Sequence, residues 1–306
     1  MKIPSDLRAG DTFGHVRTCD RLRPIYYAAA SGDFNPIHVD AEVARAAGLP
    51  GPILQGMCTY AWLAEACSSY FGDPGRFQRL FARFSRPVLP GDTVTFDGRC
   101  TSVANGVVRV EVSARNQRGE DVLRNAFAEA AWSDGPREVP PLATAAAPAE
   151  RPAANVGRRY GPYRYEAGLE KLRDFALAVA GGIPTRMYEQ EADPPPHPWL
   201  VDEDAGRASP HGGVIAAPTF GAVFAMQPFA AALVDPVLAM NLPRVVHGEQ
   251  ELAFGEPVRP GDRLETHGEV ASIERRGKLD VVAVRSSTVN QHGRKVLEGL
   301  WTAVVR

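Results

Sequence analysis

The sequence lacks the features that mark membrane-spanning and secreted proteins. No apolar run approaches the roughly 18 residues that a membrane helix needs. The first residues, MKIPSDLRAGD, contain no apolar core followed by a small-residue cleavage site, so they do not resemble a secretory leader. We therefore expect a cytoplasmic chain with no membrane partner.

Charge and cysteine content exclude further classes. The 34 basic residues are balanced by 36 acidic ones without a long basic run, so nucleic acid is not the expected partner. There is no CxxC pair and no histidine at metal-ligand spacing, which predicts buried, reduced thiols at Cys19, Cys58, Cys67 and Cys100. Without a GxGxxG segment or a metal-ligand cluster, we expect neither a metal nor an organic cofactor.

The second half of the sequence repeats parts of the first. Residues 84–92 read FSRPVLPGD and residues 254–262 read FGEPVRPGD; the pair NQRGEDVL (116–123) and NQHGRKVL (290–297) follows in the same order. Apolar and polar residues alternate after each PGD, which is typical of half-buried strands. Each NQxG tetrad predicts a hairpin turn, with Gly119 or Gly293 at positive φ. The 306 residues therefore predict two units, each ending in an antiparallel meander.

Helical periodicity precedes each meander. Apolar residues recur at Leu22, Ile25, Tyr26 and Ala29 in the first half and at Leu169, Leu172, Ala176 and Val179 in the second. A more apolar helix follows in each half, beginning near Met57 and near Phe220. Between the halves, a stretch rich in Pro and Ala predicts a surface linker. We therefore expect a first unit at residues 1–135, a linker at 136–158 and a second unit at 159–306.

The segment before the first apolar helix carries the densest chemistry. Asp33, Asn35, His38 and Asp40 fall within eight residues of SGDFNPIHVD. Such residues commonly shape an Asx turn before a proline and cap a helix. Alternatively, Pro36 stiffens a loop in which the Asp33 carboxylate and the His38 imidazole reach one water molecule. Taken by itself, the motif favours the Asx turn. The strongly apolar stretches on both sides favour the alternative, in which Asp33 and His38 act on one water molecule.

The stretch YYAAASGDFNPIHVD, from Tyr26 to Asp40, resembles the signature of the R-specific enoyl-CoA hydratases, the MaoC-like dehydratase family. The stretch GLPGPILQGM, from Gly48 to Met57, resembles the segment that leads into the central helix of that family. The resemblance implies an α+β, double hot-dog fold. Each of its two units has a long central helix wrapped by a curved antiparallel sheet, and the catalytic unit is the N-terminal one.

The resemblance also implies a site and a reaction. The family adds water across 2-enoyl thioesters of CoA or acyl carrier protein to give (R)-3-hydroxyacyl thioesters, and runs the reverse dehydration. Carried over, Asp33 and His38 activate the water, and the amide of Gly56 receives the thioester carbonyl. Expected substrate contacts are Ser31, Asn35, Gln55 and Met57. Gln55 stands where the family commonly has His, a departure that bears on substrate choice. A homodimer is a further expectation.

The second half has lost these groups. Aligning AGGIPTRM (180–187) with SGDFNPIH (31–38) places Gly182 opposite Asp33, and Arg186 or Met187 opposite His38. Ala217 and Pro218 fall where Gly56 and Met57 stand, and proline has no amide hydrogen. We expect one active centre, with the second unit lining the acyl tunnel as the resemblance implies.

Other conspicuous residues have ordinary interpretations. Turn or core positions are expected for His197, His211 and His247, and an exposed loop for ADPPPHPWL (192–200) rather than a polyproline ligand. Three arginines flank the repeated turns and are either solvated or meet the phosphates of a CoA arm: Arg83, Arg86 and Arg259.

Two other functions compete with the hydratase. Hot-dog folds also host thioesterases, for which Glu65 is the only carboxylate on the first apolar helix. The Asp33 and His38 pair has no use in thioester hydrolysis, which argues against this alternative. A catalytically silent acyl-thioester-binding subunit would require the pair to be decorative.

Overall fold

Ten strands form one antiparallel sheet that runs through the whole molecule. The computed structural model describes residues 7–132, 138–142, 154–181, 195–277 and 279–305. The strands are β1 (Thr12–Thr18), β2 (Phe77–Phe84), β3 (Thr93–Ala104), β4 (Val107–Asn116), β5 (Asp121–Ala131), β6 (Arg159–Glu166), β7 (Val245–Phe254), β8 (Arg263–Arg276), β9 (Leu279–Val289) and β10 (Lys295–Val305).

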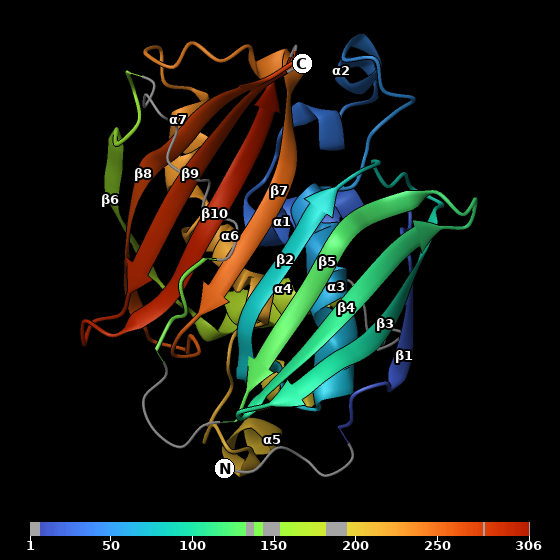
Figure 1. Ribbon diagram of the computed structural model, residues 1–306, viewed down its shortest axis with the longest axis vertical. Helices are drawn as coiled ribbons and strands as arrows, with labels where there is room; N and C mark the ends of the chain where they lie inside the picture. The colour runs from blue at the N-terminus through green and yellow to red at the C-terminus, as the bar shows by residue number, and fades with distance from the viewer. Residues whose placement is uncertain (1–6, 133–137, 143–153, 182–194, 278, 306) are drawn as a thin grey trace.

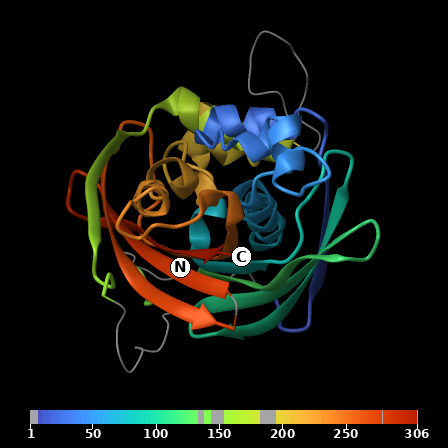
Figure 2. The ribbon, with the colours of Figure 1, turned by 90° about the horizontal axis from the view of Figure 1, so that it is seen from above.

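Helices cover the concave face of this sheet. They are α1 (Arg23–Ser31), α2 (Ala41–Ala46), α3 (Gly56–Phe71), α4 (Leu169–Ala180), α5 (Glu203–Ala208), α6 (Gly221–Phe224) and α7 (Gln227–Leu233), with the 3₁₀ turns η1 (Pro36–His38), η2 (Pro74–Arg76), η3 (Pro198–Leu200), η4 (Pro218–Phe220) and η5 (Leu242–Arg244). Figure 2 shows α3, α6 and α7 inside the curve of the sheet, with α1 and α4 as an outer layer. Among the described residues, no helix is long and apolar enough to cross a membrane.

The two halves of the sheet have the same topology and meet at β2 and β7 (Figure 1). The strand order is β1-β3-β4-β5-β2 in the first half, followed by β7-β10-β9-β8-β6 in the second. At the joint, Leu80 lies opposite Leu252 and Ala82 lies opposite Gln250. Backbone hydrogen bonds between β2 and β7 therefore merge two five-stranded sheets into one.

The repeated PGD and NQ segments form the same hydrogen-bonded corner in each half. Gln117 donates from Nε2 to the Asp92 carboxylate at 2.7 Å, and Gln291 donates to Asp262 at 3.0 Å. The Oε1 of each glutamine accepts a hydrogen bond, at 3.0 Å, from the first amide of the strand that follows the aspartate, which is β3 or β8. The turn glycines have φ of 73° and 70°, as expected for Gly119 and Gly293. Because the glutamine of each NQxG segment binds the aspartate of the PGD segment in the same unit, the PGD and NQxG motifs occur together in both halves.

The central helix is long in the first unit only. Twelve residues of α3 are buried under the first half of the sheet. In the second unit the corresponding chain is broken into η4, α6 and α7. Pro228 lies at the start of α7, where its missing N–H and its ring prevent α6 from continuing. The expectation of a long central helix therefore holds for the first unit, and the second has short segments in its place.

The apolar residues that predicted helix α1 do not form its buried face. Leu22 and Ile25 are 48% and 46% exposed, whereas Arg23 is 2% exposed. The Arg23 guanidinium pairs with Asp20 and donates to the carbonyl oxygen of Ala178, at the end of α4. A paired arginine can be buried without an uncompensated charge, so α1 packs on α4 through its arginine side.

The linker region touches the opposite, convex face of the sheet. Of residues 136–158, the structure describes 138–142 and 154–158. Leu142 is 8% exposed and packs with Ala253, Ala283 and Leu300 in a small separate cluster that also includes Val139. Part of the predicted linker thus covers apolar residues at the joint. The exact unit boundaries stay a prediction.

Candidate active site

The Asp33 and His38 side chains approach each other at the end of α1. Gly32 ends the helix, and the Asn35 carboxamide accepts the Ile37 amide at 3.3 Å to start η1. The His38 Nδ1 lies 2.8 Å from the carbonyl oxygen of Ile53, so Nδ1 carries the proton and donates. Nε2 is then free and lies 3.8 Å from Asp33 Oδ2. That gap is longer than a hydrogen bond.

Burial keeps the His38 ring neutral. The side chain is 9% exposed, and its burial lowers the pKa of His38 below the usual value of 6.5. The Asp33 charge and the Ile53 carbonyl oppose this effect without cancelling it. At neutral pH the pair therefore consists of a neutral imidazole beside a partly exposed carboxyl group.

Gly56 is the first residue of α3, where amide groups have no acceptor inside the helix. A Cβ atom at this position would lie 3.3 Å from Cε1 of Phe84, which is tight packing against an aromatic ring. The helix dipole adds partial positive charge at this end. The position is therefore suited to an incoming carbonyl oxygen or anion.

Gln55 joins the two parts of this site. It is fully buried, and its Nε2 donates to the carbonyl oxygen of Pro24 at 2.9 Å and to that of Asp33 at 3.2 Å. Gln55 precedes Gly56 in the chain, so one side chain ties the Asp33 loop and the start of α1 to the start of α3. Its Oε1 has no hydrogen-bond partner among the described residues.

The other predicted substrate contacts have visible structural roles. Ser31 Oγ donates to the carbonyl oxygen of Tyr27 at 2.7 Å and accepts the Asp33 amide at 3.2 Å. Asn35 caps η1 and is exposed, and Met57 is 3% exposed inside the core. Ser31 and Asn35 shape the loop, and contact of these residues with substrate stays a prediction.

The three candidate phosphate-binding arginines are engaged. Arg83 lies 3.7 Å from Glu249, Arg86 lies 3.7 Å from Glu120, and Arg259 donates to the carbonyl oxygen of His211. Arg83 and Arg86 remain more than half exposed, so solvent screens these two ion pairs.

Sequence reasoning missed a buried hydrogen bond between an aspartate and a histidine of the two units. His211 Nε2 lies 2.8 Å from Asp73 Oδ1, and both side chains are nearly buried. Burial would raise the pKa of Asp73, but hydrogen bonds from His211 and the Gly75 amide, together with Arg76, lower it. The two residues lie 138 positions apart, so no local sequence pattern indicates the contact.

Backbone hydrogen bonds identify the positions in the second unit that correspond to this site. In the first unit Ile53 donates to Ile37 and Leu54 donates to Val88; in the second, Ile215 donates to Trp199 and Ala216 donates to Val258. Counting from these bonds gives three equivalences, which are His38 with Leu200, Gln55 with Ala217 and Gly56 with Pro218.

Two sequence-based alignments are corrected by these equivalences. Leu200, rather than Arg186 or Met187, takes the place of His38, and Pro218 takes the place of Gly56 rather than of Met57. Gly182, Arg186 and Met187 lie outside the described residues. The signal that could have shown this is the match between NPIHVD (35–40) and HPWLVD (197–202). An intervening insertion after α4 concealed it.

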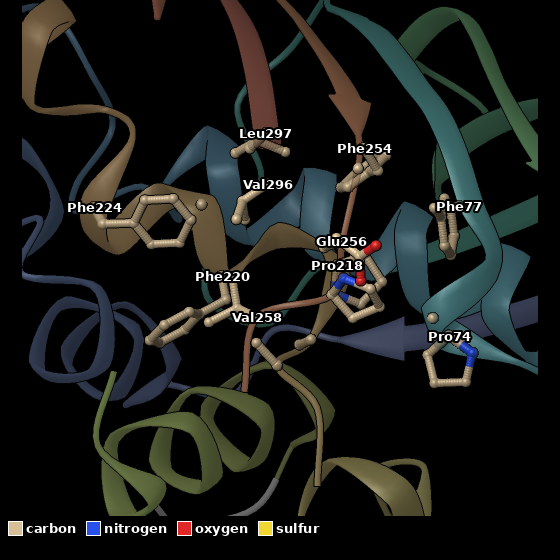
Figure 3. Close-up of a pocket in the computed structure, with 16 residues that line it drawn as sticks. Pro74, Phe77, Pro218, Phe220, Phe224, Phe254, Glu256, Val258, Val296 and Leu297 are labelled. Carbon is tan, nitrogen blue, oxygen red and sulfur yellow. The ribbon is translucent and has the colours of Figure 1, made fainter. Parts of the chain in front are cut away.

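The second unit nevertheless keeps a pocket at this place. It has a volume of about 40 Å³ and is mainly apolar, with Pro218, Phe220, Phe254 and Val258 on its walls (Figure 3). Among the described residues, no group of His, Cys, Asp or Glu side chains could hold a metal ion.

Comparison with known proteins places the chain in a family. A model described as MaoC like domain matches residues 16–121, and one described as FAS1-like, dehydratase domain region, matches residues 154–299. The chain is 38% identical over 154 residues to a UPF0336 protein of Streptomyces griseus, covering 49% of this chain and 92% of that protein. It is 35% identical over 96 residues to a probable enoyl-CoA hydratase 2 of Dictyostelium discoideum, covering 31% and 32% of the two chains.

A solved structure extends the match over the full length. A conserved hypothetical protein from Mycobacterium tuberculosis, described as having a double hotdog fold, superposes with a TM-score of 0.63 at 17% identity. The superposition covers 98% of this chain and 97% of that chain. The double hot-dog fold expected from the sequence is thereby confirmed, and the chain belongs to the MaoC-like dehydratase family.

Proposed function

We propose that this protein reversibly hydrates 2-enoyl thioesters of CoA or acyl carrier protein to (R)-3-hydroxyacyl thioesters. The observation that carries the proposal is the convergence of Asp33, His38 and the Gly56 amide, held together by Gln55. The probable enoyl-CoA hydratase 2 of Dictyostelium discoideum, similar over 96 residues, supports the same reaction class.

The proposed chemistry balances without a cofactor. A water held between Asp33 Oδ2 and His38 Nε2 gives its oxygen to C3 of the substrate. The pair takes one proton from that water and returns one to C2, a task for closely spaced groups of moderate pKa. Negative charge that develops on the thioester oxygen is stabilised by the Gly56 amide at the start of α3.

The thioesterase alternative is weaker because its candidate base is occupied. Both carboxylate oxygens of Glu65 accept hydrogen bonds from the Arg17 guanidinium, and His15 lies 3.4 Å away. Both oxygens of this carboxylate are taken by hydrogen bonds, so it is poorly placed to accept a proton from an attacking water.

The test is the loss of conjugated-thioester absorbance when the purified protein meets crotonyl-CoA and longer enoyl-CoAs. Asp33→Asn and His38→Gln are each expected to lower kcat by about 10² to 10⁴. His197→Gln, at the second-unit counterpart of Asn35, is the matched control and is expected to retain turnover. Release of free thiol without loss of the double bond would favour a thioesterase. Absence of both reactions would favour a silent binding subunit.

A further inference from the structure

The last turn of α1 is held by a side chain of the second unit. Lys171, in the first turn of α4, donates from Nζ to the carbonyl oxygen of Ala29 at 2.8 Å. The two residues lie 142 positions apart in the chain, and α1 and α4 pack side by side in the outer helical layer (Figure 2). Because the last carbonyl groups of a helix have no partner inside that helix, they need donors from outside it. This bond therefore ties the end of α1 to the second unit.

The carbonyl group of Ala29 is available because the chain leaves the helix before Asp33. In a continuing helix, the amide of Asp33 would donate to this carbonyl oxygen. Instead, the Asp33 amide donates to Ser31 Oγ at 3.2 Å. The ammonium group of Lys171 thus occupies the place that the Asp33 amide would have in a longer helix.

Three hydrogen bonds fix the backbone that carries the Asp33 carboxyl group. Ser31 holds the amide of Asp33, Gln55 holds its carbonyl oxygen, and Lys171 holds the turn from which the loop departs. The first two partners belong to the first unit and the third belongs to the second. The 3.8 Å between Asp33 Oδ2 and His38 Nε2 depends on where this backbone lies. All three bonds therefore bear on the geometry of the proposed reactive pair.

The second unit shows the same arrangement in reverse. Arg23 of α1 donates from Nη1 to the carbonyl oxygen of Ala178 at 2.7 Å. Ala29 and Ala178 each stand three residues before the glycine that ends the helix, which is Gly32 or Gly181. Each helix therefore gives a cationic side chain to the same carbonyl group of the other helix. Of these two bonds, the one to Ala29 adjoins the proposed reactive pair.

The position of Lys171 is not explained by α4 alone. Lys171 is the third residue of a 12-residue helix, and the dipole of α4 disfavours a positive charge at this end. Partial burial lowers the pKa of Lys171 below its usual value, and the charge of Asp174 opposes this effect. The C-terminal end of α1 offers both the opposite potential and a carbonyl acceptor. The cation is therefore better matched to α1 than to its own helix.

We propose that Lys171 of the second unit is a positioning residue for the Asp33 carboxyl group in the first-unit site. It acts through the carbonyl group of Ala29, which fixes where the chain turns out of α1, and not by contact with substrate. The second unit then supports the chemistry of the first by holding its loop. This rests on the proposed hydratase function for the reaction that the position of Asp33 serves.

Steady-state kinetics of the full-length protein with crotonyl-CoA test the proposal. Lys171→Met keeps the length of the side chain and removes its N–H donors, so kcat is expected to fall about tenfold or more. KM is expected to change by less than about twofold, because the loop positions the reacting groups and not the bound thioester. Lys171→Arg keeps a cationic donor and is expected to bring kcat to within about threefold of the wild type.

Arg173→Met is the matched control on the same helix. Arg173 donates to the carbonyl oxygen of Val201 at 2.8 Å, so it makes the same kind of bond. Val201 belongs to the second-unit counterpart of the loop, in which Leu200 corresponds to His38. This variant is expected to keep the kcat of the wild type. Equal losses of kcat in Lys171→Met and Arg173→Met overturn the proposal, and so does an unchanged kcat in Lys171→Met.

Amide hydrogen exchange of residues 29–38 separates this proposal from the hydratase itself. Lys171→Met is expected to raise the exchange rate there about threefold or more, and Arg173→Met is expected to leave it unchanged. If the wild type consumes no enoyl-CoA but exchange rises in Lys171→Met alone, the hydratase proposal fails and the hold of Lys171 on the Asp33 loop stands. If exchange in this segment is the same in Lys171→Met and the wild type, Lys171 does not fix the loop, and the positioning proposal fails whatever the rates.

Discussion

The Gly56 end of the first unit and the Pro218 end of the second share a backbone and differ in almost every polar group. His38 corresponds to Leu200, Gln55 to Ala217 and Gly56 to Pro218, while the backbone hydrogen bonds around them are the same. The hydrogen-bonded backbone is therefore the same in the second unit, which lacks the proposed reactive groups. Conversely, this backbone alone is not evidence of activity, so function has to be argued from side chains.

The largest effect is expected when Gly56 is replaced by proline, the residue at the corresponding position of the second unit. Gly56→Pro removes the amide hydrogen, and proline is tolerated at the first position of a helix. We expect kcat to fall by about 10² to 10³ while the protein stays folded. Gly56→Ala keeps the amide and pushes only on the Phe84 ring, so it should lose less than about tenfold. Steady-state kinetics with crotonyl-CoA would decide, and equal losses in both variants would exclude an oxyanion role for the amide.

Lowering the pH is expected to reduce stability through His247 but not through Phe77, which lies at the same position of the repeat and has no titratable group. Burial lowers the pKa of His247 to about 4 and also lowers the pKa of His38, whereas the pKa of an unfolded histidine is about 6.5. The unfolded chain binds more protons between these values, so stability is present above pH 6.5 and is lost as the pH falls toward 4. For His247 the loss reaches up to about 3 kcal/mol.

Urea unfolding at a series of pH values measures this effect. His247→Phe should flatten the acid limb of the stability curve, and His292→Gln, at an exposed turn position, serves as the histidine control. An acid limb that is equally steep in His247→Phe and in the wild type would show that His247 is not held neutral by the fold.

Gln55→Ala copies Ala217 and should weaken the clamp between the two helices. The change leaves the carbonyl oxygens of Pro24 and Asp33 without their donor. We expect the free energy of unfolding to fall by about 2 kcal/mol, together with a lower kcat because the Asp33 loop is less fixed. Denaturant unfolding and kinetics of one preparation measure both. Unchanged kcat with reduced stability would restrict Gln55 to a folding role.

The smallest effect is expected where the units are most alike. Gln117→Ala and Gln291→Ala each remove a hydrogen bond to an aspartate and one to a strand amide. Each should cost about 1 kcal/mol in the free energy of unfolding. Clearly unequal values would show that the two corners, alike in geometry, differ in their surroundings.

Sequence patterns predicted the repeated parts of the fold well. The meanders, the turn glycines and the buried α3 follow from alternation, turn residues and apolar content, which are local properties. The buried face of α1 did not follow, because Arg23 is neutralised by Asp20 and the end of α4. Burial of a charged residue depends on partners that periodicity does not reveal.

The geometry of the candidate site could be predicted only in part, for the same reason. Asp33 and His38 lie close in sequence, and the loop that joins them is short, so their approach was foreseeable. The clamp by Gln55 depends on how α1 meets α3, and the approach of His247 to Phe84 depends on the pairing of β2 with β7. Such contacts are set by tertiary packing, beyond the reach of a motif.

The joint between β2 and β7 lies within a single chain, so the two units that meet there need not have identical sequences. Phe77 and His247 each lie seven residues before the repeated phenylalanine, Phe84 or Phe254. In a dimer of identical units, Phe77 and His247 would be the same residue, and so would Gly56 and Pro218. Any change that improved one site would then be imposed on the other. Because the two units are covalently joined, a substitution changes one of them only, so the two ends of the sheet can carry different side chains on the same backbone.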